Sequence, residues 1–127
     1  MIAIDTSALM AILLGEPQAG ACAAALEAED ELLISAATVA EALIVAARRR
    51  LKNEMERLIE GLGVQIVDVT PTSARRVEAA YARWGKGVHP AALNFGDCFS
   101  YAVAIEHGCP LLYVGRDFTQ TDVGCVL

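Results

Sequence analysis

Short apolar segments alternate with helix-length segments along this chain, and that alternation constrains its fold more than any other feature. Four segments read as buried strands, namely Ile2–Ile4, Leu32–Ile34, Val64–Val69 and Leu111–Val114, and Gly124–Leu127 reads as a short final strand. Strands that alternate with helices of about 10 to 15 residues favour a mainly parallel sheet covered on both faces. The sequence therefore predicts an α/β fold.

Six segments between these strands have helical patterns. They are Ser7–Leu14, Gln18–Glu29, the long stretch from Ser35 to Arg50, Asn53–Leu62, Pro71–Trp84 and Asn94–Glu106. Ser35 is the expected N-cap of the third helix. A length of 127 residues suits one domain, 1–127, and a hydrophobic content of 55% supplies a substantial core. We find no linker and no internal repeat.

Charge and composition narrow the class of protein. No uncharged run is long enough to span a bilayer, and Met1 is not followed by the basic segment of a secretory signal, so we expect a cytoplasmic protein. The four cysteines form no C-x-x-C pair, and we expect free, mostly buried thiols rather than a zinc site. His89 and His107 read as loop or helix-end residues.

Four acids stand in apolar or turn contexts where a carboxylate is unusual. Asp5 directly follows the first strand and Asp117 follows the fourth, at the sheet edge where ligands bind in open α/β folds. Glu41 lies within the almost wholly apolar stretch Ala36–Ala47, and a Glu buried there costs several kcal/mol unless it is paired or metal-bound. Asp97 begins a helix of core-type residues.

Each acid also has an ordinary structural explanation. Asp5 could cap the following helix, although Ser7 could take that role and leave Asp5 free. Asn94 and Asp97 have the spacing of a capping box, and Glu41 could form a buried salt bridge with one of Arg48, Arg49 or Arg50. A fifth acid, Asp122, is as consistent with a turn as with a site.

Taken together, the four acids suggest a metal site. Two carboxylates about 4 Å apart repel by roughly 4 kcal/mol at an effective dielectric constant of about 20, so a cluster must bind protons or a cation. All-oxygen ligands without Cys or His favour Mg²⁺ or Mn²⁺ over zinc. Such a metal can activate water and stabilise charge on a scissile phosphate. We therefore expect phosphodiester hydrolysis.

The net charge of −6, from 16 acids and 10 bases, is unexpected for an enzyme of nucleic acids. Without the four proposed ligands, however, 12 acids remain against 10 bases, a balance of −2. Local rather than overall charge then decides whether a polyanion can bind.

An ordered set of motifs resembles the PIN domain and, more narrowly, the VapC-type ribonuclease toxins. The matching pieces are Ile4-Asp5-Thr6-Ser7, Thr38-Val39-Ala40-Glu41, Asn94-Phe95-Gly96-Asp97 with Tyr101-Ala102, and Leu111 to Phe118 running into Thr121-Asp122-Val123. Each piece is a weak signal alone, but together they cover essentially the whole chain in order and at family spacing. No acid of the family pattern is missing.

This resemblance implies a PIN-like three-layer sandwich, with a mostly parallel five-stranded sheet of order 3-2-1-4-5 between helices. It also implies an endoribonuclease dependent on Mg²⁺ or Mn²⁺, the toxin of a toxin–antitoxin pair, a cognate VapB-like antitoxin and a homodimer. By position, Asp5, Glu41, Asp97 and Asp117 would be the catalytic and metal-binding acids. Ser7, Asn94 and Asp122 would support them.

Basic residues near these acids are candidates for binding RNA. Arg116 adjoins Asp117, and Lys86 and His89 lie in the loop before Asp97. Arg48 and Arg49 belong to a basic run at the end of the third helix, which could equally be a solvated helix end. Trp84 and Tyr81 could stack on bases, but a role in the core or a dimer is the better explanation.

Three other functions compete with the toxin. One is a housekeeping PIN nuclease that processes RNA or DNA, and another is an inactive binding module. The third is a receiver-like signalling domain, which would need paired acids early in the chain and a Lys after a late strand. This chain has only Asp5 early and Arg116 late, so the receiver ranks low.

Overall fold

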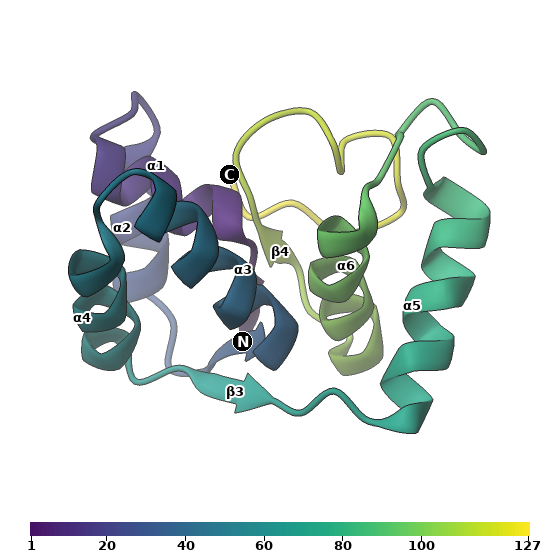
Figure 1. Cartoon of the computed structure of the whole chain (residues 1–127), viewed down its shortest axis with the longest axis horizontal. Helices are drawn as coiled ribbons and strands as arrows, with labels where there is room; N and C mark the ends of the chain where they lie inside the picture. The colour runs from purple at the N-terminus through teal and green to yellow at the C-terminus, as the bar shows by residue number, and fades with distance from the viewer.

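The computed structural model describes all 127 residues and contains ten regular elements (Figure 1). In chain order they are β1 (Ile2–Ile4), α1 (Thr6–Leu14), α2 (Ala19–Glu27), β2 (Leu32–Ser35), α3 (Ala36–Arg48), α4 (Lys52–Leu62), β3 (Gln65–Val67), α5 (Pro71–Trp84), α6 (Phe95–His107) and β4 (Leu111–Leu112). The predicted alternation of strands and helices is confirmed, with most ends shifted by one or two residues.

The strands form one sheet of order β3-β2-β1-β4, and every pair is parallel. The fifth strand was predicted wrongly, because residues 124–127 make only an isolated bridge between Leu111 and Cys125. The bridge lies beside β4, where the order 3-2-1-4-5 requires it. β4 itself is two residues long, and Pro110 before it has no N–H to extend the ladder.

Two hydrophobic cores lie on opposite faces of the sheet, and strand alternation assigns residues to them. Figure 1 shows α1–α4 on one side and α5 and α6 on the other. Ile2 and Ile4 of β1 point into the core under α1, α2, α3 and α4. Ala3 between them points into the core under α5 and α6. Leu111 and Leu112 of β4 divide between the cores in the same way. The three-layer arrangement thus follows from the two-residue period of a strand.

Side-chain caps begin α1, α3 and α6. Ser35 caps α3, as predicted, by accepting a hydrogen bond from the Ala37 N–H at 3.2 Å. Asp5 caps α1, so the N-cap role considered for this residue is confirmed. Asn94 and Asp97 form the capping box that their spacing suggested, at the start of α6. These caps fix where the first turns of three helices lie.

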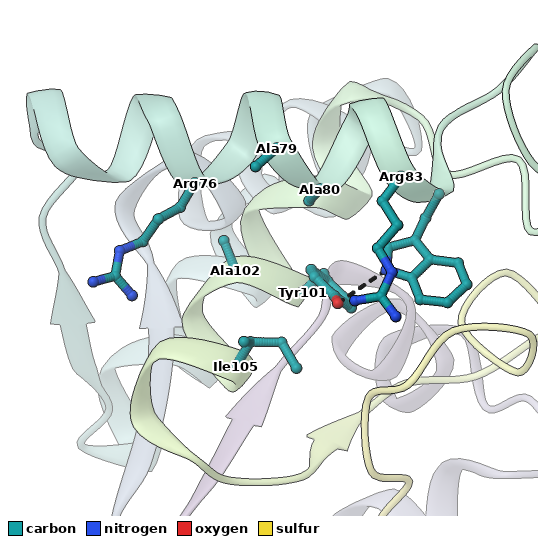
Figure 2. A pocket seen from close by; sticks show the side chains of 8 residues that line it. Arg76, Ala79, Ala80, Arg83, Tyr101, Ala102 and Ile105 are labelled. Carbon is teal, nitrogen blue, oxygen red and sulfur yellow. Dashed lines mark hydrogen bonds between the residues drawn. The ribbon is translucent and has the colours of Figure 1, made fainter.

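A hydrogen-bond chain that begins at the buried Trp84 ties α5, α6 and the C-terminal segment together. The Trp84 indole N–H donates to the Tyr101 hydroxyl at 2.9 Å, and that hydroxyl donates to Asp122 Oδ1 at 2.5 Å. Arg83 donates to Asp122 Oδ2 at 3.3 Å and lies 4.4 Å from the centre of the Trp84 ring. Figure 2 shows Arg83 and Tyr101 converging at one end of a hollow between α5 and α6.

No single helix is long and apolar enough to cross a membrane, although α1 and α2, bent by 119° to each other, pass that test as a pair on length and composition.

Substitution Tyr101→Phe should lower the free energy of unfolding by about 1–3 kcal/mol, because the buried Trp84 N–H loses its acceptor. Urea denaturation followed by Trp fluorescence measures this change. Tyr81→Phe is the matched control, since the Tyr81 hydroxyl donates to the Lys86 carbonyl at an exposed site and its loss should stay within about 0.5 kcal/mol. Equal losses in the two variants would contradict a buried role for Tyr101.

Candidate active site

Asp5 lies at the carboxyl end of the central strand β1, buried with 4% of its surface exposed. Its carboxylate accepts three hydrogen bonds. The Ser7 N–H and hydroxyl donate to Oδ2 at 3.1 and 2.6 Å, and the Ser100 hydroxyl donates to Oδ1 at 2.6 Å. Hydrogen bonds of this kind stabilise an ionised carboxylate in a buried place.

The polar layer around Asp5 extends to two hydroxyls that sequence reasoning missed. Ser100 is 1% exposed and Thr38 is 1% exposed, and their hydroxyls lie 3.3 Å apart. Because the Ser100 proton is directed to Asp5, Thr38 is the donor in this pair. The one available signal was spacing, since Thr38 stands three residues before Glu41 and Ser100 three after Asp97, on the same helix faces as the acids.

Asp97 lies in the first turn of α6 with 8% of its surface exposed. Its Oδ2 accepts from the Asn94 N–H at 3.0 Å, and Asn94 Oδ1 accepts from the Asp97 N–H at 2.8 Å. The pKa of Asp97 is raised to about 7, mainly by burial; the charges of Asp5, Asp117 and Glu41 also raise it, and the hydrogen bond from the Asn94 N–H lowers it. Asp97 therefore interacts electrostatically with the other three acids.

Glu41 reaches the site from α3. Its Oε1 accepts a hydrogen bond of 2.6 Å from the Thr6 hydroxyl, and its carboxylate lies so close over Gly96 that a Cβ there would collide with it. The alternative of a salt bridge with Arg48, Arg49 or Arg50 is wrong, because Glu41 has no ion-pair partner.

The expectation that α3 leaves Glu41 fully buried is also wrong. Glu41 is half-buried, and Ile44, one turn further along, is 62% exposed. Some apolar side chains of α3 are therefore exposed to solvent and do not pack in the core.

Asp117 is exposed, on the segment that follows β4. Gly115 turns the chain there with a φ of 106°, which side-chain-bearing residues rarely adopt. Phe118 anchors the segment, being 2% exposed and packed on Tyr113 at 5.0 Å between ring centres. The backbone at Asp117 is thus held in place, while its side chain is exposed to solvent.

The other predicted residues divide into two groups. Ser7 joins the site, since its hydroxyl donates to Asp5 and accepts from the Val114 N–H at 3.0 Å. Asn94 holds Asp97, as described. Asp122 instead bonds Tyr101 and Arg83 and does not contact the four acids. Its contacts make it an anchor of the C-terminal segment.

The basic residues that were predicted to bind RNA have no acidic partners. Arg48, Arg49, Lys86 and Arg116 are all exposed, and none forms a salt bridge. Arg116 adjoins Asp117, whereas Arg48 and Arg49 lie roughly 10–12 Å along the α3 axis from Glu41 at 1.5 Å per residue. His89 instead accepts from the Ala91 N–H and packs edge-on against the buried Trp84.

The acids suit a divalent cation in chemistry more than in their present geometry. All the candidate donors are oxygens, which Mg²⁺ and Mn²⁺ prefer. No group of three or more His, Cys, Asp or Glu side chains is arranged so that it could hold a metal ion. Asp5, Glu41 and Asp97 are instead turned toward protein donors. Burial, followed by the charges of the other three acids, raises the pKa of Asp97.

The hollow between α5 and α6, of about 230 Å³, contains none of the four acids. Its lining is mostly apolar, with Arg76 and Arg83 toward its two ends (Figure 2). Arg76 lies 4.0 Å from Glu106 and Arg83 3.3 Å from Asp122, so both cations already have anionic partners. The acids at the carboxyl end of β1 remain the candidate active site.

Comparison with known proteins agrees with this assignment of the fold. The family model described as PIN domain matches residues 2–124. Ribonuclease VapC36 of Mycobacterium tuberculosis is 45% identical over 124 residues, covering 94% of this chain and 89% of that protein. Ribonuclease VapC of Mycolicibacterium smegmatis is 41% identical over 126 residues, covering 97% and 98%.

Solved structures share the fold at lower identity. Mycobacterium tuberculosis VapC20, described as a sarcin-ricin loop cleaving toxin, superposes with a TM-score of 0.77 at 20% identity, covering 97% of this chain and 96% of that one. A toxin–antitoxin complex from Klebsiella pneumoniae superposes with a TM-score of 0.73 at 22% identity, covering 100% and 97%. The predicted resemblance is confirmed, and the chain belongs to the PIN-domain family and, within it, to the VapC ribonucleases.

Proposed function

We propose that this protein is an endoribonuclease toxin that cleaves RNA with the help of Mg²⁺ or Mn²⁺ bound among Asp5, Glu41, Asp97 and Asp117. The observation that carries the proposal is the state of Asp97. This carboxyl group is buried in the first turn of α6 and has three acids as electrostatic neighbours, which raise its pKa together with burial. A structural cap alone needs no such neighbours.

A bound cation would neutralise these acids, activate water and stabilise charge on the phosphate. The chain's own residues supply positioning. Ser7 and Ser100 hold Asp5, Asn94 holds Asp97, and Thr6 holds Glu41, so each carboxylate is oriented by a donor on a rigid element. In the overall reaction water adds to phosphorus, the bond to the 3′-oxygen breaks and that oxygen gains a proton. The products carry 5′-phosphate and 3′-hydroxyl ends.

Local charge supports an RNA substrate despite the net charge of −6. Arg116 stands next to Asp117 and Lys86 lies in the loop before α6, both exposed and without acidic partners. We assign these two side chains, with Arg48 and Arg49 farther along α3, to the RNA backbone. Cleavage would take place in the cytoplasm, and homodimerisation stays a prediction.

We further propose that an amphipathic antitoxin segment binds the surface of α1, α3 and α4. Half-buried apolar side chains gather there, including Ile12 and Leu13 of α1. A hollow of about 260 Å³ between α3 and α4 combines Val39, Leu43 and Ile59 with two acids, Glu56 and Glu60. An apolar floor with an acidic border fits a helix that has one apolar and one basic face. The relatives of known structure include toxin–antitoxin complexes.

Asp97→Asn should lower RNA cleavage at least about 100-fold while the fold survives, since even the loss of a residue that only orients a metal ligand costs 10- to 100-fold. Total cellular RNA is incubated with and without Mg²⁺, and new 5′ ends are mapped. Asp5→Asn should behave alike. Asp30→Asn changes an exposed acid outside the site and should leave the rate unchanged. Full activity in either purified site variant refutes the assignment.

The metal-free protein should lose stability as pH rises. Asp97 ionises near pH 4 in the unfolded chain but near 7 in the folded one, so its stabilising proton is fully bound below about pH 4 and lost through about pH 7. Mg²⁺ should raise the melting temperature more at pH 8 than at pH 5, where protons compete for the same oxygens. In Asp97→Asn, the stability of the metal-free protein should depend less on pH, and the difference between the Mg²⁺-induced melting-temperature shifts at pH 8 and pH 5 should become smaller. Equal Mg²⁺-induced shifts of the wild-type protein at both pH values would argue against a site at Asp97.

Expression of the chain should arrest growth, and a small protein encoded beside it should relieve the arrest. Leu43→Glu, placed in the hollow between α3 and α4, should keep the arrest but abolish its relief, because the new charge stands where an apolar side chain of the partner packs. Plating assays with and without the neighbour measure both effects. Unimpaired growth on expression of the wild type would favour a housekeeping nuclease, and continued relief of Leu43→Glu would move the antitoxin elsewhere.

A further inference from the structure

An apolar hollow opens directly beside the acids, between α3 and the first turns of α6. It has a volume of about 370 Å³ and is lined by three large side chains, Ile44, Phe95 and Phe99, and by the small residues Ala37, Ala40 and Gly96. Glu41 completes the lining, so the hollow and the candidate active site share a wall. Gly96 also connects them, since it precedes Asp97.

Phe95 and Ile44 are the most exposed large apolar side chains of the protein, at 71% and 62%. Neither contributes to the two cores. The Phe95 ring stands nearly perpendicular to Phe99, with 81° between planes and 5.0 Å between centres. Because Phe95 begins α6 directly after the Asn94 cap, its backbone is fixed while most of its side chain meets solvent.

The chemistry of the hollow selects one part of a nucleotide. It contains no cation, and Glu41 at its border is an acid, so a phosphate would be repelled. An aromatic side chain with open surface is instead a stacking partner for a base, and such stacking is tolerant of sequence. A base also lies adjacent to its own phosphate along the strand, and Glu41, which borders the hollow, is one of the acids that we assign to the scissile phosphate.

The size of the hollow argues against a protein partner. A stable protein interface buries about 800 Å² on each side, with a central cluster of anchors. Here two strongly exposed apolar side chains border a space that suits one planar group. The half-buried apolar side chains to which we assign a partner helix gather elsewhere, on the surface of α1, α3 and α4.

We propose that this hollow is a base subsite, in which Phe95 stacks on the base of a nucleotide next to the scissile phosphate of a single-stranded RNA. The subsite rests on the proposed nuclease function and deepens it. Ile44 borders the base, and the small residues Ala37, Ala40 and Gly96 leave it room. Phe95 is thereby a substrate-binding residue that takes no part in holding the cation.

The test uses an RNA oligonucleotide that spans a cleavage site mapped with the wild-type protein. Phe95→Ala should raise KM roughly 5- to 150-fold, the range expected for losing one base–aromatic stack. Phe95→Trp should restore KM, and Phe95→Leu, which keeps apolar bulk without a π face, should not. Ile105→Ala is the matched control, because Ile105 is an exposed apolar residue at the far end of the same helix.

A second substrate separates stacking from general damage. Removing the base of one nucleotide beside the cleaved bond should raise KM for the wild type and add nothing for Phe95→Ala, because the same contact is lost once. Mg²⁺ binding measured by calorimetry should be unchanged in Phe95→Ala. If each abasic position instead raises KM by the same factor for the wild type and for Phe95→Ala, the two effects are additive and the subsite is refuted.

The remaining outcomes are also decisive. If the wild type cleaves RNA but Phe95→Ala cleaves with the same KM, the subsite is refuted and the nuclease stands. An unchanged KM together with weaker antitoxin binding, or with a smaller mass in solution, assigns the hollow to a protein interface and refutes the subsite. If the wild type cleaves no RNA, the proposed function fails and the subsite fails with it.

Discussion

The burial of the Asp5 carboxylate at the end of the central strand is the constraint on which the rest of the site depends. A charged group in such a place is unfavourable by several kcal/mol unless donors surround it. Ser7 supplies two donors from the first turn of α1, and Ser100 supplies one from α6. This second donor requires α6 to pack against β1, so the position of Asp97 on the same helix follows from satisfying Asp5.

The sheet topology explains why this edge, rather than another, collects the acids. β1 lies between β2 and β4, and the helices after β1 and β2 cover one face while α5 and α6 cover the other. The connections from β1 to β2 and from β2 to β3 thus lie on one face and the connection from β3 to β4 on the other, so the strand order reverses between β1 and β4, the place where open α/β sheets bind ligands. Asp5 lies at the carboxyl end of β1, at this reversal. Glu41 approaches it from one layer and Asp97 from the other.

Much of this arrangement was predictable from the sequence, for identifiable physical reasons. Apolar strands between helices left few topologies, and Asp5 and Asp117 stood out because each follows such a strand. Ser100 and Thr38 gave no comparable signal, since a hydroxyl on an apolar helix becomes a carboxylate donor only through packing. The prediction of a final strand was wrong because β4 is too short to pair with one along its length. Helix α3 is also more exposed than its apolar composition indicated. The roles of the site residues in cleavage remain predictions.

The order of the elements along the chain has a consequence for biosynthesis. β1, the middle of the sheet, is made first, whereas β4 and the segment bearing Asp117 are made last. A nascent chain that ends before α6 contains Asp5 but lacks Ser100, Asp97 and Asp117. Asp5 and Glu41 therefore leave the ribosome before Asp97 and Asp117, and an unfinished polypeptide lacks half of the acids to which we assign RNA cleavage.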